Sequence, residues 1–441
     1  MVDSSLSQMK NTVIVICLLL LAAVLRLHNY AVYPQRGATS DEYAFAFQGI
    51  SLLTQGVPVA WSAIPLYKNL THLTIDGLYF PIVKPYLDHP PLFGLLVGAW
   101  ATALGERTFE AVSLGVIRLV PIMLAIISSL LLYLWGKRVY GAGAAMWSLA
   151  MYATGTLFVV NSRIVVAESL LTVFFLLALI IVSVLPKKPR IWQFLVLGVV
   201  CALALLTKVL GVVVFLSVIT LCFSRGLGLR RLFWVTLPFV LVLGVFFLYG
   251  RVYNEVLFWA IQTYQGSRTV GPNALFMILT SPIIVNKVYY DGWYFWGLFA
   301  LGLAAIDAKK NVMLVVPAFL YTFLLLASVN QMDVHGWYVI PLFPFLALAG
   351  GKLLWEMQQN ISFMLGIFAT FVWLPLYREL YEIPFGIAPS AYRGFLFFLL
   401  MPILGSVLMR SETWYRRLAR LLCLLAVFAT MIGTIRYIHP A

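Results

Sequence analysis

The chain has 441 residues, of which 62% are hydrophobic and only 10% are charged, and its mean hydropathy is +0.96. Soluble globular proteins usually carry about 25% charged residues, so this composition excludes a soluble domain and indicates a polytopic membrane protein. The formal net charge is +14. In a membrane protein such an excess is first interpreted by the positive-inside rule, and we expect no nucleic-acid partner.

Apolar segments recur along the whole chain, and about 13 of them approach the ~20 residues that a membrane-spanning helix requires. We therefore predict an all-α polytopic fold with about 13 transmembrane helices. The predicted spans are residues 11–29, 115–135, 142–160, 168–185, 191–207, 209–224, 231–249, 293–307, 312–328, 336–352, 361–377, 394–409 and 418–436.

A shorter apolar segment, residues 91–104, begins at the pair Pro90-Pro91 and is expected to lie in the membrane interface. If it does not cross, later basic clusters such as Lys137-Arg138 all fall on one side, which is then cytoplasmic. The opposite, extracytoplasmic face holds two long loops, residues 30–114 and 250–292, and the first is expected to contain interfacial helices. We predict one transmembrane domain, residues 1–441, without a soluble C-terminal domain.

The first of these loops contains a pair of acids, Asp41 and Glu42. Thr39 and Glu42 have the spacing of a capping box, which predicts that an amphipathic helix begins here and ends at Gly56. A carboxylate in the first turn of a helix is favoured in its ionised form, so Asp41 could act as a base at neutral pH. The alternative is that both acids only cap the helix.

Further motifs lie on the same predicted face. The stretch from Asp88 to Leu92 reads Asp-His-Pro-Pro-Leu, Arg163 precedes Glu168 by five residues, and Lys208 ends a Leu-Thr-Lys run between two apolar segments. A lysine at a membrane-embedded position is costly and usually has a partner, for which an anionic lipid phosphate is a candidate.

At these motifs the chain resembles the GT-C glycosyltransferases of the protein O-mannosyltransferase and aminoarabinose-transferase type, which take a sugar from a polyprenyl-phosphate carrier. That family also has a Tyr-x-x-Pro-Leu-x-Pro run, matched here from Tyr338 to Pro344. The motifs occur in the family's order over most of the chain. Glu168 stands where aspartate is common, and the C-terminal soluble domain of some members has no counterpart.

The resemblance implies an inverting transfer of a sugar from a polyprenyl-phosphate donor to an acceptor hydroxyl on the extracytoplasmic side. Asp41 would be the general base and Glu42 would orient it or the acceptor. Arg163 and Lys208 suit the donor phosphate, because the leaving group gains charge as the bond breaks. Supporting positions are Asp88, His89, Glu168, His335 and Tyr338.

Several alternatives stay open at this stage. No cofactor is certain, and a divalent metal on Asp41, Asp88, His89, Glu168 or His335 is a minority alternative. Four aromatic residues, Tyr43, Trp61, Trp293 and Tyr338, could stack on sugar rings or simply mark the bilayer interface.

The partners are the lipid-linked donor, membrane lipids and an acceptor that could be a lipid, a glycan or a protein. A transporter or flippase, or an O-antigen-ligase-like enzyme, is the rival function. The short chain favours a prokaryotic plasma membrane.

Overall fold

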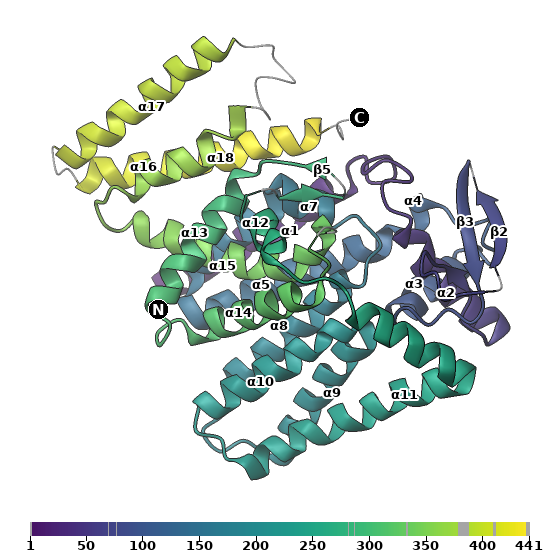
Figure 1. Cartoon of the computed structure of the whole chain (residues 1–441). Helices are drawn as coiled ribbons and strands as arrows, with labels where there is room; N and C mark the ends of the chain where they lie inside the picture. The colour runs from purple at the N-terminus through teal and green to yellow at the C-terminus, as the bar shows by residue number, and fades with distance from the viewer. Residues whose placement is uncertain are drawn as a thin grey trace.

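The computed structural model describes residues 2–68, 70–75, 77–280, 282–285, 287–331, 334–377, 388–408 and 412–437. Helices dominate this part of the chain, and most of them run alongside one another in a single body (Figure 1). Its helices are α1 (Val2–Leu27), α5 (Leu119–Tyr140), α6 (Ala142–Thr154), α7 (Thr156–Asn161), α8 (Glu168–Val184), α9 (Ile191–Thr207), α10 (Val212–Ser224), α11 (Leu229–Gly266), α12 (Pro272–Thr280), α13 (Gly292–Ile306), α14 (Val312–Ser328), α15 (Phe343–Met357), α16 (Met364–Phe368), α17 (Pro389–Leu408) and α18 (Glu412–Arg436).

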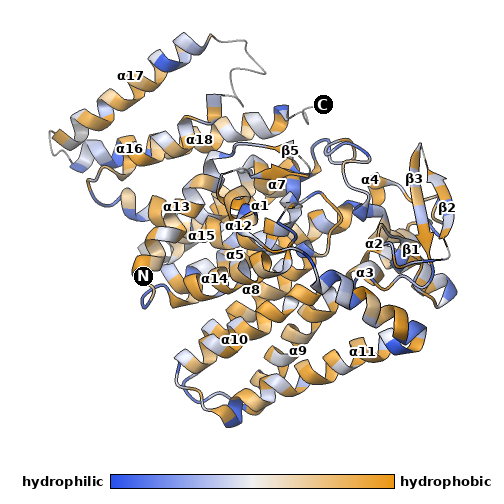
Figure 2. Ribbon diagram, in the orientation of Figure 1, coloured by the Kyte–Doolittle hydropathy of each residue, from blue (hydrophilic) through white to orange (hydrophobic). Residues whose placement is uncertain are grey.

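Short 3₁₀- and π-helical segments join or extend some of these helices. They are the 3₁₀ segments η1 (Val209–Gly211) and η2 (Gly336–Leu342) and the π-helical segment η3 (Ala369–Trp373). Most of the helices are coloured hydrophobic along much of their length (Figure 2), as expected of helices in a membrane. Many large apolar side chains are exposed there, for example Phe398 on α17 and Val256 on α11. The chain is an integral membrane protein.

Each of the predicted spans contains helix. In the described part of the chain, five segments are long and apolar enough to cross a membrane by length and composition. They are Met9–Leu27, Leu114–Tyr140, Leu229–Gly266, Gly336–Met357 and Glu412–Arg436. Shorter apolar helices occupy most of the other predicted ranges. The count of about 13 crossings stays a prediction.

The first long loop departs from the all-α expectation, because it contains a small antiparallel sheet. Strands β1 (Ala60–Trp61), β2 (Leu70–Ile75) and β3 (Leu78–Val83) pair in the order β1–β3–β2. In the β2–β3 register Leu70 faces Val83 and Ile75 faces Leu78. A second pair of two-residue strands, β4 (Ile283–Ile284) and β5 (Lys287–Val288), lies in the other loop. Such short strands give no helical period and are easily missed in a sequence this apolar.

The same loop contributes three helices, α2 (Asp41–Gln55), α3 (Leu92–Ala103) and α4 (Leu114–Ile117). Helix α2 ends at Gly56, as predicted, in the left-handed conformation with φ of +69°. It is not a surface helix, because every residue from Glu42 to Ser51 is buried. Helix α3 packs directly against it through glycines that let the two backbones touch. A Cβ on Gly98 would lie 2.2 Å from the carbonyl carbon of Gly49, which leaves no room for a side chain.

We therefore expect Gly98→Ala to destabilise the first loop by about 1–3 kcal/mol, the usual effect of overpacking. The unfolding temperature of the purified protein in detergent measures the effect. Gly302→Ala is the matched control, because Gly302 lies in α13 with nothing within 4 Å of an added Cβ. Equal unfolding temperatures for Gly98→Ala and the wild type would contradict the tight α2–α3 contact.

Candidate active site

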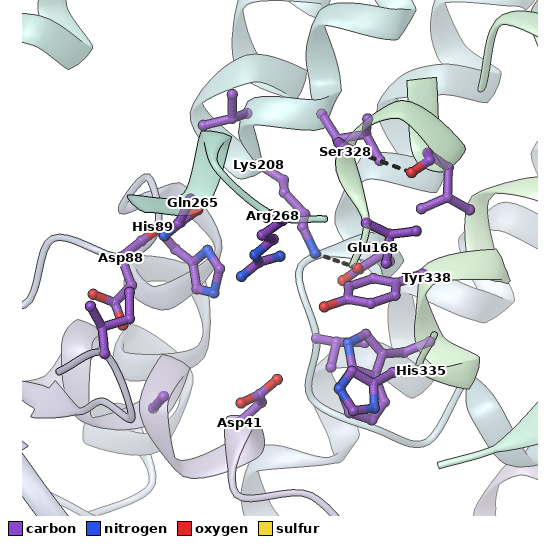
Figure 3. A pocket seen from close by; sticks show the side chains of 18 of the residues that line it. Asp41, Asp88, His89, Glu168, Lys208, Gln265, Arg268, Ser328, His335 and Tyr338 are labelled. Atoms are coloured by element: carbon purple, nitrogen blue, oxygen red, sulfur yellow. Dashed lines mark hydrogen bonds and ion pairs between the residues drawn. The ribbon is translucent and has the colours of Figure 1, made fainter. Parts of the chain in front are cut away.

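Segments that are far apart in the chain meet around a cavity of about 590 Å³ (Figure 3). It lies where the first loop meets the ends of α9, α11 and α14. The cavity brings together all of the predicted site residues except Glu42 and Arg163, namely Asp41, Asp88, His89, Glu168, Lys208, His335 and Tyr338. The clustering of ionisable groups from so many elements marks it as the candidate active site.

Asp41 is the first residue of α2, so the helix begins where the sequence predicts. The predicted capping box does not form. The Thr39 hydroxyl accepts a hydrogen bond from the amide of Asp41 at 3.2 Å, and Ser40 at the N-cap makes no side-chain cap bond. Within the described part of the chain, the Asp41 carboxylate makes no hydrogen bond. Burial raises the pKa of Asp41 to about 6, and the nearby Lys208 ammonium opposes that shift.

Glu42 turns away from the cavity and pairs with Arg118 instead of capping α2. Two parallel hydrogen bonds, each 2.8 Å long, join the guanidinium to the carboxylate, and both side chains are fully buried. The amide of Val165 also donates to Glu42 at 3.2 Å. Arg118 further donates to the carbonyls of Tyr30 and Pro34, each at 2.8 Å. A buried bidentate ion pair is stronger than a capping bond, which explains why the capping box is lost.

Arg163 is also buried, and its guanidinium contacts backbone oxygens. It donates to the carbonyl of Leu25 at 2.7 Å and to that of Tyr33 at 3.2 Å. These contacts hold the end of α1 and the loop that follows it. The structure therefore does not bring Arg163 to the cavity with Asp41 and Lys208.

Lys208 lies in a break between α9 and α10, as the interruption of the apolar pattern predicts. Its backbone is extended, with φ of −158° and ψ of 143°. The ammonium forms an ion pair with Glu168, the first residue of α8, and lies 4.8 Å from the ring centre of Tyr338. The partner that a buried lysine requires is thus present within the protein.

Asp88 is held by two hydroxyl groups of the first loop. Ser62 and Tyr67 each donate to its carboxylate at 2.6 Å. Burial raises the pKa of Asp88 to about 6, although both hydrogen bonds act in the opposite direction. The neighbouring His89 is neutral at pH 7, because burial lowers its pKa to about 3 with help from Lys208 and Arg268.

Sequence reasoning missed the contribution of α11. This helix bends at Asn254, where φ is −172° and ψ is 98°, and the Asn254 side chain accepts from the amide of Leu257 at 3.0 Å. Its last turns carry Gln265 to the cavity, and Arg268 follows as a second cation beside Lys208. The asparagine was the available signal, because it is a preferred residue for starting a new helix after a predicted span.

The four aromatic candidates divide into two pairs. Trp61 and Tyr338 line the cavity, and the Trp61 indole donates to the carbonyl of Ser40 at 2.6 Å. Tyr43 and Trp293 are buried elsewhere, and the Trp293 indole donates to the Thr430 hydroxyl. Only the first pair can contact a sugar in this cavity.

The cavity does not fit the metal alternative. Among the described residues, no three histidine, cysteine or acidic side chains are grouped as metal ligands. Two of the proposed ligands are already engaged, since Glu168 pairs with Lys208 and Asp88 accepts from two hydroxyls.

Comparisons with known proteins agree with this architecture. Residues 88–252, a little over a third of the chain, match the family model described as dolichyl-phosphate-mannose-protein mannosyltransferase. No curated protein matches the chain by sequence. The chain is similar in structure to ArnT from Cupriavidus metallidurans bound to undecaprenyl phosphate, with a TM-score of 0.59 and 15% identity, over 96% of this chain and 77% of ArnT.

Two larger proteins share the fold as well. AglB from Archaeoglobus fulgidus, in complex with an inhibitory peptide and a dolichol-phosphate, has a TM-score of 0.51 and 10% identity, over 95% of this chain and 56% of AglB. Arabinosyltransferase EmbB from Mycobacterium smegmatis has a TM-score of 0.52 and 12% identity, over 95% of this chain and 41% of EmbB.

The helical body of this membrane protein thus encloses a cavity lined by ionisable side chains. Residues 88–252 match the mannosyltransferase family model, and the chain as a whole shares its fold with ArnT, AglB and EmbB.

Proposed function

We propose that the chain moves a sugar from a polyprenyl-phosphate carrier to an acceptor hydroxyl, with inversion at the anomeric carbon. The observation that carries the proposal is the lining of one cavity by a carboxylate, Asp41, and two cations, Lys208 and Arg268 (Figure 3). ArnT, which shares the fold, has been solved with undecaprenyl phosphate bound.

In the proposed reaction the acceptor oxygen attacks the anomeric carbon while the bond from that carbon to the phosphate oxygen breaks. The bonding pair leaves with the phosphate, whose growing negative charge is stabilised by Lys208 and Arg268. The hydroxyl proton passes to the Asp41 carboxylate, which acts as general base. A single displacement inverts the configuration and needs no covalent intermediate. Arg268 takes the role that the sequence gave to Arg163.

The cavity also offers an apolar side to the carrier. Val209 and Leu210 of η1 line it together with Val212, the first residue of α10, and Leu324 and Leu325 line it from the end of α14. A phosphate at Lys208 would place its first isoprene units against these residues. We propose that this end of the body is extracytoplasmic and that the membrane is a prokaryotic plasma membrane, on the charge asymmetry of the loops.

Cells that express the wild type or Asp41→Asn test the function. With the variant, the polyprenyl-phosphate sugar should accumulate and one class of glycosylated lipid, glycan or protein should disappear, both measured by mass spectrometry. The accumulated lipid would identify the sugar and the lost conjugate would identify the acceptor. Unchanged profiles of both in cells that contain the variant would contradict the proposal.

The carrier phosphate contact gives a separate prediction. Loss of a hydrogen bond to a charged group costs about 1.5–3 kcal/mol, so Lys208→Ala should weaken binding of undecaprenyl phosphate roughly 10- to 150-fold. Arg268→Ala should act in the same direction. Lys84→Ala is the control, because Lys84 is an exposed lysine of the first loop outside the cavity lining. Binding to the purified protein by native mass spectrometry is the measurement, and equal affinity of Lys208→Ala and Lys84→Ala would rule the contact out.

The pH dependence of turnover follows from the pKa of Asp41. A general base must be ionised, and burial raises the pKa of Asp41 from 3.8 to about 6, so activity should fall as the pH drops through about 6. At pH 5 the rate should be about tenfold below its plateau, whereas an unshifted carboxylate would lose activity only near pH 4. Asp88 titrates in the same range. If the activity of Asp88→Asn still falls as the pH drops through about 6 in single-turnover assays, the titrating group is Asp41. If this fall disappears in Asp88→Asn, the titrating group is Asp88.

A further inference from the structure

Glu168 is an acid that lines the cavity but has no part in the proposed reaction. It lies at the start of α8 with its side chain 1% exposed, and its carboxylate forms an ion pair with Lys208, whose side chain is 16% exposed. The centre of the Tyr338 ring lies 4.8 Å from the same ammonium. Within the described part of the chain the Glu168 carboxylate accepts no hydrogen bond from a backbone amide, so its partner is the lysine.

An isolated ammonium in such a site would be at risk of losing its proton. Burial opposes the charge on Lys208, but the Glu168 carboxylate offsets this, with smaller help from Tyr338 and Asp41, so that the pKa of Lys208 lies above its ordinary value. The charged and titratable groups around Lys208 are Glu168 on α8, Tyr338 on η2, Asp41 on α2, His89 after the sheet and Arg268 after α11. Of these, only Glu168 forms an ion pair with it in the described structure.

We propose that Glu168 is a positioning residue that keeps Lys208 charged and directed into the cavity, ready to bind the carrier phosphate. The identity of that phosphate rests on the proposed function. The protonation of Lys208 does not depend on it. An ammonium has three N–H donors. One goes to Glu168, which leaves two for an anion. Glu168 thus acts through Lys208 and needs no contact with the sugar.

The state of Lys208 can be measured without any substrate. Acetic anhydride modifies only the neutral amine, so the extent of Lys208 acetylation against pH, read by peptide mass spectrometry, reports its proton. Removing an opposite charge at this range shifts a pKa by about 1–3 units, so in Glu168→Gln the half-point should move down by at least about one pH unit. Lys84 in the same samples is the internal standard and should not move.

Two controls separate this effect from damage to the fold. Glu106→Gln removes another buried glutamate, which accepts from the Ser113 hydroxyl at 2.6 Å and does not line the cavity, and it should leave the Lys208 half-point unchanged. Glu168→Asp keeps the charge at a greater distance and should give an intermediate half-point. An identical half-point for Lys208 in the wild type, Glu168→Asp and Glu168→Gln would overturn the proposal.

The pH dependence of undecaprenyl phosphate binding tests whether Glu168 also affects the function of Lys208. Between pH 7.5 and 9.5 a phosphate monoester is already fully ionised, since its second pKa is about 6. The wild-type affinity should stay level over this range, and that of Glu168→Gln should fall about tenfold as the ammonium is lost. In the double variant Glu168→Gln/Lys208→Arg the affinity should be level again, because arginine keeps its charge.

The outcomes distinguish the two claims. If the wild type binds undecaprenyl phosphate through Lys208 but Glu168→Gln shows the wild-type pH profile, the role of Glu168 is wrong and the proposed function stands. If the wild type does not bind undecaprenyl phosphate, the proposed donor is wrong, and the acetylation half-point still decides whether Glu168 holds the charge of Lys208.

Discussion

Asp41→Asn is expected to lower sugar transfer by ~10²–10⁴-fold, the usual contribution of general base catalysis. Asparagine keeps the shape of the side chain but cannot accept the hydroxyl proton. Stability should hardly change, because the Asp41 carboxylate makes no hydrogen bond within the described structure and the N-cap of α2 is Ser40. The rate of product formation from the lipid-linked donor, measured together with donor affinity, checks this result.

Donor affinity should be retained or improved in Asp41→Asn, since removing a negative charge beside Lys208 favours an anionic ligand. A loss of activity of less than about threefold would leave Asp41 without a chemical role. The search for the base would then turn to Asp88, the other carboxylate that lines the cavity without an ion pair to a lysine.

Arg118→Met is expected to destabilise the protein by about 3–5 kcal/mol, because it leaves the buried Glu42 carboxylate without its partner. The same change removes the donors to the carbonyls of Tyr30 and Pro34, which shape the loop before Asp41. Unfolding in detergent should show a large fall in the unfolding temperature, with transfer lost in parallel.

Two further variants test whether the instability of Arg118→Met comes from the broken ion pair. The double variant Glu42→Gln/Arg118→Met removes both charges and should recover part of the lost stability. Arg416→Ala breaks a more exposed pair with Glu412, 3.3 Å long, and should cost no more than about 1 kcal/mol. If Arg118→Met and Arg416→Ala were equally mild, the buried pair would not stabilise the first loop.

The positions of the helices could be predicted from the sequence because each span needs a long apolar run, and apolar runs are easy to detect. Asp41, Asp88, Glu168 and Lys208 could also be predicted, since they are polar groups next to such runs. The sheet could not, because strands of two to six residues leave no period distinct from the surrounding apolar sequence.

The choice between cations could not be predicted for a different reason. Arg163 and Arg268 are both arginines in loops predicted to be extracytoplasmic, and the sequence gives no sign of which one meets unpaired carbonyls. Arg163 donates to the carbonyls of Leu25 and Tyr33. These carbonyls lie at and after the end of α1, where backbone oxygens lack helical partners. That competition is visible only when the chain is folded. Likewise, Glu42 has the spacing of a capping residue, but in the folded chain its carboxylate pairs with Arg118.

The bend of α11 at Asn254 has a consequence for how this protein can change over evolutionary time. On the two sides of the bend, Tyr253 and Gln265 donate hydrogen bonds to the first loop, to the carbonyls of Gly56 and Asp88 respectively, each at 2.9 Å. Asp41 and Arg268 thus belong to different loops that are fastened to one another. A substitution that reshapes either loop displaces groups of the other. New sugar or acceptor preferences should therefore arise through paired changes in both loops, and grafting one loop alone from a relative should yield an inactive chimera.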